Sequence, residues 1–540
     1  MAMRTTPRRT QLVSLRDFTG GLNLVSDAFK LGDNESPDLL NVDLDRRGGF
    51  QVRRGVAPYS TTALSAAPDA IWTYNSSGTI YTMVQIGTVI WKGTGSTWTT
   101  TGTSLGSATQ DVCPVTFNNN SYWARGDANV GKFTGGAASS MGVAFNDTIT
   151  ATSGNIPRAD HMAVHAGYMW VAGTWESGTH YPNRIRFSWA NTFDNSGENW
   201  RTDDYIDIDE GKDFDPITAV VPFGDQLIIF KRDSIFALYG TSAETFSLVN
   251  VSSTVGAVSH AAAIATPAGL FFFDHASGVN VYTGRNVTNV FSQILPALRD
   301  DDIPRLQADK VDMGWVNNRL WVSVPWADDP TPPRGVTFVL DPNLKTGGSW
   351  TKYSLQLGPY SRGYRTVDNL AYVYGTNLVF KLDVPGQYFD NFGAVIGIET
   401  IDAWYRTRWL DLGEPAVKKR WRRTEALMQV DQAYDLPVVS YSDYDATVSV
   451  KNFLFNAVAS SSGASDGIWD DAASDWDSAK WARSGVYGYV DRGQTLGIAR
   501  SVSLRVGGQV LTTADPTVPQ APTFWGVDAL IFKYVPRRVR

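Results

Sequence analysis

The sequence predicts an all-β protein, a β-propeller of about seven four-stranded blades followed by a C-terminal β-sandwich platform domain. Charged residues make up only 19% of the chain, which contains 49 glycines and 19 tryptophans. This composition suits strands and tight turns better than exposed helices. Short β-rich runs are joined by tight turns, and groups of such runs recur about every 42–56 residues, the spacing of propeller blades.

The clearest of these groups covers residues 216–252. Its β-rich runs are separated by short turns such as Gly224-Asp225 and Arg232-Asp233, which predicts an antiparallel meander. A single meander leaves its apolar faces uncovered and needs neighbours. Six further groups supply them, at residues 70–100, 111–134, 160–209, 260–292, 311–353 and 361–382.

The seventh group contains only three strand-like runs. We therefore expect an N-terminal strand, either residues 11–15 or residues 50–54, to supply the missing one. Closing the ring in this way would remove an exposed sheet edge that otherwise invites aggregation.

The domain boundaries follow from this pattern. Residues 1–55 form an arm and lead-in that carries the ring-closing strand, residues 56–385 the propeller, and residues 386–540 the platform domain. In the platform, alternating residues predict strands, and 405–412 is expected to pair with 422–430. The platform strands are predicted at 405–412, 422–430, 436–441, 446–453, 486–490, 501–506 and 527–534. Helix-like spacing occurs only at 300–312 and 416–427.

The lead-in resembles the start of a known protein family. Its pattern consists of Phe18, Gly20, Gly21, Leu22, Asn23, Asn34, Glu35, Asn41, Gly49, Arg53 and Gly55. This pattern is similar to the N-terminal region of bacteriophage tail β-propeller proteins, above all the tail nozzle, or tail tubular protein, of short-tailed phages and related minor tail proteins. Residues 184–188, 224–240, 406–422 and 529–538 resemble later parts of the same proteins.

The resemblance implies a structural virion protein and no enzyme. It implies a homo-oligomeric, hexameric ring around the DNA exit channel, with adaptor, fibre or tip proteins as partners and non-specific passage of genomic DNA. The protein would be made in the host bacterial cytoplasm and reside in the virion tail. One alternative is a minor tail or tail-tip protein of a long-tailed phage that contacts the host surface. Another is a glycan-cleaving propeller enzyme, which would need clustered carboxylates.

The net charge of −7 argues against a protein that reads DNA sequence, because such proteins are usually basic. The densest acidic run contains Asp203, Asp204, Asp207 and Asp209. These are the candidate channel-lining residues, since carboxylates would repel the phosphates of passing DNA. Alternatively, this acidic run forms a solvated rim of the propeller.

Two groups of residues are candidates for contacts with other tail proteins. Trp469, Trp476 and Trp481 lie in one acidic, Ser- and Ala-rich stretch, and tryptophan is favoured as an interface anchor. Alternatively, this stretch folds back on the sandwich. Arg537 and Arg538 give the C-terminus a basic tip, which would suit an acidic neighbour or simply remain solvated.

No residue pattern predicts catalytic, cofactor-binding or metal-binding residues. His161 and His165 are four apart, but Met162 stands where a metalloprotease motif needs glutamate, and no third ligand lies nearby in sequence. Cys113 is the only cysteine, which excludes an intrachain disulfide, and its apolar surroundings predict a buried, inert thiol. The sequence shows neither a signal peptide nor an apolar run long enough to span a membrane.

Overall fold

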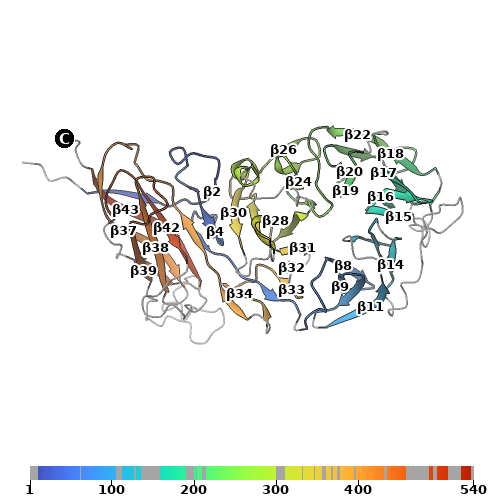
Figure 1. Ribbon diagram of the computed structural model, residues 1–540, viewed down its shortest axis with the longest axis horizontal. Coiled ribbons are helices and arrows are strands. Elements are labelled where there is room, and N and C mark those ends of the chain that lie inside the picture. The colour runs from blue at the N-terminus through green and yellow to red at the C-terminus, as the bar shows by residue number, and fades with distance from the viewer. Residues whose placement is uncertain are drawn as a thin grey trace, which may run out of the picture. The chain divides into compact units, whose positions relative to one another are not determined.

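The computed structural model describes most of the chain (Figure 1). The described residues are 10–60, 62–95, 97–104, 112–126, 129–135, 158–189, 200–201, 203–209, 214–299, 310–330, 333–345, 347–354, 361–365, 369–373, 377–393, 397–430, 434–457, 486–490, 496–508 and 524–536. They divide into two compact units, each considered by itself below. The propeller unit comprises Ala57–Phe338 and Leu357–Leu382, and the platform unit comprises Met1–Val56, Val339–Gln356 and Asp383–Arg540.

The fold is all-β, as the sequence predicts. The helical segments that are described from end to end are short, the 3-10 turn η3 (Ser292–Ile294) and α1 (Pro296–Arg299). No helix in the described part of the chain is long and apolar enough to cross a membrane.

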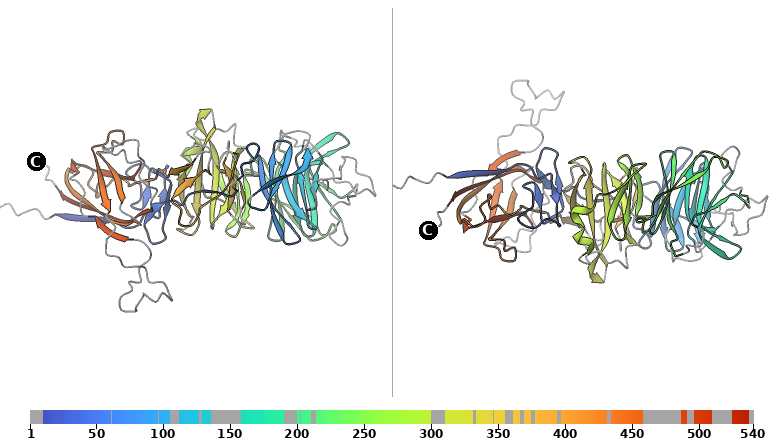
Figure 2. Two further views of the ribbon diagram at one scale, coloured as in Figure 1. Left: turned by 90° about the horizontal axis from the view of Figure 1, so that it is seen from below. Right: turned by 90° about the horizontal axis from the view of Figure 1, so that it is seen from above.

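The propeller unit consists of antiparallel sheets that follow one another along the chain and surround a common centre in Figure 1; Figure 2 gives two further views of the same sheets. Blade 1 comprises β8 (Ala70–Ser76), β9 (Thr79–Ile86), β10 (Val89–Gly93) and β11 (Trp98–Ser104). Blade 2 has three described strands, β12 (Cys113–Phe117), β13 (Asn120–Ala124) and β14 (Gly131–Phe133). Blade 3 comprises β15 (Arg158–His165), β16 (Tyr168–Glu176), β17 (Thr179–Phe187) and β18 (Tyr205–Asp207).

The later blades repeat this order. Blade 4 comprises β19 (Ile217–Phe223), β20 (Gln226–Lys231), β21 (Ile235–Tyr239) and β22 (Ser247–Ser252). Blade 5 comprises β23 (Ala263–Thr266), β24 (Gly269–Asp274), β25 (Gly278–Tyr282) and β26 (Val287–Asn289). The sixth sheet, blade 6, comprises β27 (Asp312–Val316), β28 (Arg319–Pro330), β29 (Pro333–Asp341) and β30 (Ser349–Tyr353), although β30 and the end of β29 fall within the residue range of the platform unit. Blade 7 comprises β31 (Ser361–Arg365), β32 (Leu370–Val373), β33 (Val379–Lys381) and β7 (Ala57–Pro58).

Apolar clusters between consecutive sheets hold the ring together. Trp170 and Ile185 of blade 3 pack with Leu227 and Ile229 of blade 4 in one cluster of buried side chains. Every residue of β20 is buried, because a central blade strand has a neighbouring sheet on both faces. The first strands also contact one another in series, from β12 to β15, β19, β23, β27, β31 and β8.

The ring is closed by an early strand, but not by either strand expected from the sequence. Ala57 and Pro58 pair with Lys381 and Phe380 at the outer edge of blade 7. The two predicted candidates belong to the platform unit instead. There β1 (Gln11–Leu15) pairs with β43 (Trp525–Pro536), and β6 (Phe50–Val52) pairs with β43 and with β5 (Val42–Leu44). Because β6 is paired on both of its edges, it has no free edge to offer the ring.

The platform unit is a two-sheet sandwich, as predicted. One sheet has the order β40-β37-β43-β6-β5, with β1 on β43 and β41 on β37, and the other has the order β39-β38-β42-β36-β4. The strands not yet defined are β4 (Leu39–Leu40), β36 (Trp404–Arg406), β37 (Lys419–Val430), β38 (Tyr434–Ser442), β39 (Lys451–Ala457), β40 (Val486–Val490), β41 (Gly497–Ala499) and β42 (Val502–Gly507). Two short pairs, β2 (Gly21–Leu22) with β3 (Glu35–Ser36) and β34 (Phe389–Asn391) with β35 (Ile398–Thr400), complete the unit.

Two sequence expectations about this unit are wrong. The helix-like stretch at 416–427 lies largely in strand β37, about half of whose side chains are buried in the sandwich. The predicted pairing of 405–412 with 422–430 does not form, since β36 pairs with β4 and β42 whereas β37 pairs with β40, β41 and β43. Sandwich strands that follow one another often belong to different sheets, which the strand pattern alone does not reveal.

Candidate functional site

The lead-in residues that carry the family resemblance form a connected buried network in the platform unit. The Arg53 guanidinium donates two hydrogen bonds to the Asp390 carboxylate, from Nη1 to Oδ1 at 2.9 Å and from Nη2 to Oδ2 at 2.7 Å. Arg53 Nε donates to Asn41 Oδ1 at 2.9 Å, and Asn41 Nδ2 donates to the Asp402 carbonyl at 2.8 Å. Residues of the lead-in are thereby fixed to the C-terminal part of the chain.

The electrostatics of this network favour the ion pair. Burial lowers the pKa of Arg53, but the Asp390 carboxylate outweighs burial and holds the pKa above its ordinary value. The Tyr353 hydroxyl donates a hydrogen bond to Asp43 beside this pair. Because the two buried charges are paired through two hydrogen bonds, neither is available to a ligand. We interpret the pair as a structural connection.

Aromatic packing and glycine contacts fix the same segment. The Phe18 ring meets Phe50 edge-on at 4.9 Å and Tyr405 at 5.3 Å. A Cβ added to Gly55 would lie 1.7 Å from the Phe389 carbonyl oxygen. At Gly21, φ is +71° and an added Cβ would lie 2.6 Å from the Trp350 carbonyl oxygen, so a side chain is excluded on both counts.

The acidic residues predicted to line a channel lie at and beside β18, the last strand of blade 3. The Asp207 carboxylate accepts two hydrogen bonds from Arg184, at 2.7 and 2.8 Å. Asp203 is exposed, Asp204 and Asp209 are half-buried, and Asp209 has a φ of +51°. Burial, aided by the Asp203 charge, raises the pKa of Asp204. That these four aspartates line a channel stays a prediction.

The remaining interface candidates cannot be placed. Trp469, Trp476 and Trp481, together with Arg537 and Arg538, lie outside the described residues. Their role as contact residues stays a prediction.

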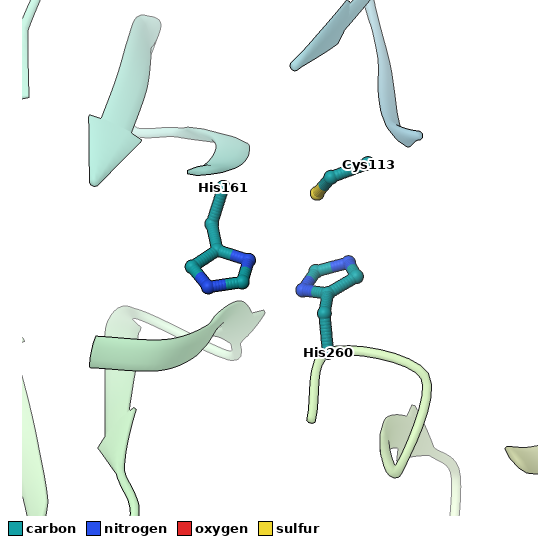
Figure 3. A group of neighbouring side chains, drawn as sticks. All are labelled: Cys113, His161 and His260. Carbon is teal, nitrogen blue, oxygen red and sulfur yellow. The ribbon is translucent and has the colours of Figure 1, made fainter. Parts of the chain in front are cut away.

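A cluster that the sequence did not reveal lies in the propeller unit. Cys113 begins β12, His161 lies in β15, and His260 lies in the turn before β23, so three blades contribute one side chain each. Their ligand atoms all lie within 4.8 Å of one another. Figure 3 shows the sulfur and the two imidazoles pointing toward one another from three separate segments.

The backbone holds the cluster in place. The Met162 amide donates to Cys113 Sγ at 3.3 Å, and Sγ lies 3.5 Å from the Met162 carbonyl oxygen. The turn that carries His260 is tied to blade 6, because the Met313 amide donates to the Ala261 carbonyl at 2.9 Å. The Cys113 thiol is buried, as predicted.

The cluster favours a charged thiolate. Burial raises the pKa of Cys113, but the charge of His260 and the contacts with both imidazoles outweigh it and lower the pKa to about 5. In the reverse direction, burial lowers the pKa of His260, but the Cys113 charge outweighs it and raises that pKa. The sequence prediction of an inert thiol therefore did not account for its two neighbours.

Only part of this cluster could have been found in the sequence. Cys113 and His161 occupy the first strands of successive repeat groups, and the first strands of a propeller face its centre. His260 follows almost one hundred and fifty residues after Cys113, and only ring closure brings it near. His165, which the sequence paired with His161, is not part of the group.

Several solved structures are similar to this chain at low sequence identity. No family model and no curated protein sequence matches the chain. The computationally designed Ika8 protein matches with 10% identity over 60% of this chain and 99% of its own, at a TM-score of 0.35. YCF48 bound to a D1 peptide matches with 8% identity over 61% of this chain and 98% of its own, at 0.37.

A third similar structure is the extracellular domain of the BT4673 protein from B. thetaiotaomicron. It matches with 8% identity over 61% of this chain and 40% of its own, at a TM-score of 0.37. These likenesses carry no argument about function. The propeller is evident from the succession of four-stranded antiparallel sheets and their contacts in series.

Proposed function

We propose that this chain is a structural protein of a bacteriophage tail, a nozzle-type component that forms a homo-hexameric ring around the DNA exit channel. The observation that carries the proposal is the arrangement of the lead-in residues that resemble tail nozzle proteins. They form buried joints, exemplified by Arg53 with Asp390, rather than a reactive pocket. Buried joints of this kind suit a protein whose function is structural.

In this proposal the propeller and the platform present surfaces to neighbouring copies and to adaptor, fibre or tip proteins. The genome passes without sequence recognition, which agrees with the net charge of −7. The site of action is the tail of the virion, reached after synthesis in the host cytoplasm.

The ring is tested by the mass of the purified full-length protein. Native mass spectrometry and negative-stain electron microscopy are expected to show a closed ring of six 59.2-kDa chains. An equal mixture of tagged and untagged chains is expected to give mixed rings when refolded together. A protein that stays monomeric at tens of micromolar, alone and with the other tail proteins, would contradict the proposal.

Location is tested separately on virions. Gold-labelled antibody against the purified chain is expected to mark the tail, between the head and its distal end. Label at the distal tip alone would favour the alternative of a host-contacting tip protein. Absence of the chain from purified virions, measured by mass spectrometry, would overturn both.

A further inference from the structure

The group formed by Cys113, His161 and His260 in the propeller unit provides a donor set without an assigned role. The residues come from blades 2, 3 and 5, and their donor atoms lie within 4.8 Å of one another. No other group of three or more histidine, cysteine, aspartate or glutamate side chains reaches this spacing among the described residues. We propose that these three side chains bind one zinc ion.

The unsatisfied nitrogen atoms of the cluster favour a bound cation. His161 Nδ1 and His260 Nδ1 are buried and form no hydrogen bond of normal geometry with any described residue. A buried polar atom without a partner destabilises the folded state, because it has lost its hydrogen bonds to water. The two imidazole rings lie nearly parallel, with an interplanar angle of 20° and centroids 5.9 Å apart. Ring stacking does not provide a hydrogen-bond partner for a ring nitrogen, since the nitrogen lone pair or N–H lies in the plane of the ring.

The chemistry of the donor atoms limits which metal ions would bind. One thiolate and two imidazoles are ligands for zinc and copper, whereas magnesium and calcium prefer carboxylate and carbonyl oxygens. Zinc bonds of about 2.3 Å to sulfur and 2.0–2.1 Å to nitrogen place tetrahedral ligands about 3.3–3.6 Å apart. The observed upper limit of 4.8 Å requires a contraction on the order of 1 Å, which rotation of the two histidine side chains supplies.

The position of the site suggests what the ion does. It would join β12 of blade 2 to β15 of blade 3 and to the turn before β23 of blade 5. A metal ion that binds the folded state but not the unfolded chain increases the free energy of unfolding by its free energy of binding. The ion would thus act as a cross-link among three blades, and this role does not depend on the proposed tail function.

Metal content of the wild-type protein is the first test. After purification without chelator, mass spectrometry of the elements is expected to find one zinc per chain. The stripped protein, titrated with CoCl₂, is expected to show a thiolate-to-cobalt charge-transfer absorption that saturates at one equivalent. One equivalent of copper in place of zinc, or no saturable cobalt signal in a folded protein, would overturn the zinc assignment.

Variants then locate the site. His260→Gln and Cys113→Ser are expected to lose the bound zinc and the cobalt absorption, while the matched control His165→Gln retains both, since His165 lies on the same strand as His161 but outside the group. Chelation is expected to lower the thermal midpoint of unfolding of the wild type by several degrees and to leave His260→Gln unchanged. Circular dichroism establishes that the His260→Gln variant is folded. A zinc content of this folded variant equal to that of wild type would refute the site.

Discussion

Arg53 and Asp390 lie 337 residues apart in the sequence, yet their side chains form a buried ion pair with two hydrogen bonds. Arg53 also donates to Asn41, and Nη2 reaches the Ser354 carbonyl at 3.2 Å. The pair therefore fastens the lead-in to a short strand, β34, near the start of the C-terminal segment of the platform unit.

Removing one partner of this pair is expected to destabilise the platform unit. Asp390→Ala leaves the Arg53 charge buried and unpaired, which costs about 3–5 kcal/mol. Urea unfolding followed by tryptophan fluorescence measures the loss. The control Asp33→Ala removes the exposed partner of Arg408 and is expected to cost no more than about 1 kcal/mol. Equal losses in the two variants would contradict a structural role, and the double variant Arg53→Met with Asp390→Leu is expected to recover part of the stability.

Gly55 is expected to tolerate no side chain. In Gly55→Ala the new Cβ would lie 1.7 Å from a backbone oxygen of Phe389, so the two segments must separate, at a cost of about 1–3 kcal/mol or more. The control Gly32→Ala places its Cβ 3.2 Å from the movable side chain of Asn34 and is expected to be nearly neutral. Thermal unfolding of the two variants measures the difference, and equal midpoints would show that the lead-in is not fixed at this point.

Acid is expected to weaken blade 3 through Glu176. Burial raises the pKa of this carboxyl, but the hydrogen bonds from Arg186 and the charges of Arg186 and Arg184 outweigh burial and hold the pKa below its ordinary value. A carboxyl with a lowered pKa in the folded state stabilises the protein above its unfolded pKa, and this contribution is lost as the pH falls through the folded pKa. Glu176→Gln should therefore be less stable than wild type at pH 7.

The measurement is the midpoint of urea unfolding between pH 7 and pH 3. The difference in the midpoint of urea unfolding between Glu176→Gln and wild type is expected to become smaller as the pH falls below about 4.5. Asp233→Asn, which changes an exposed carboxylate in blade 4, is the control and should show a small gap throughout. A Glu176→Gln gap that stays constant over this range would contradict the assignment.

Ring closure by β7 is testable with a cross-link. Ala57 pairs with Lys381 across the last blade, so Ala57→Cys with Lys381→Cys is expected to form a disulfide on oxidation. Because the bridge closes a long loop, it should raise the thermal midpoint of unfolding, reversibly with reductant. Each single-cysteine variant is the control, and gel mobility without reductant reports the bridge. Cross-linking only under denaturing conditions would contradict the pairing.

The acidic residues beside β18 are expected to affect DNA passage only if the proposed ring is correct. Asp203 is exposed, so Asp203→Lys adds positive charge without breaking the Arg184 pair of Asp207. Slower genome ejection from virions that carry Asp203→Lys, measured by dye release, is the expected result because the new charge would attract phosphates. Glu244→Lys, at an exposed position in blade 4, is the control. Equal ejection rates in both variants and wild type would remove Asp203 from the channel.

Local patterns in the sequence were sufficient for the strands. Apolar, β-rich runs bounded by turn residues predicted β20 and β21, and the repeat spacing predicted a ring of similar sheets. The tendency to form a strand depends mainly on the residues of the strand itself, so a short window of sequence is enough to predict it. The stretch at 416–427 shows the limit, because burial in the sandwich overrode a helix-like spacing.

The sequence by itself determined the class of fold, the order of the blades and the separate platform. The tertiary structure decided that β7 closes the ring, that Arg53 meets Asp390, and that His260 joins Cys113 and His161. These relations join residues far apart in the chain, and their partners are chosen by the packing of whole sheets rather than by neighbours in sequence. The repeat pattern in the sequence predicts the strands of each blade, but only the closed ring determines which blades contribute side chains to the same cluster.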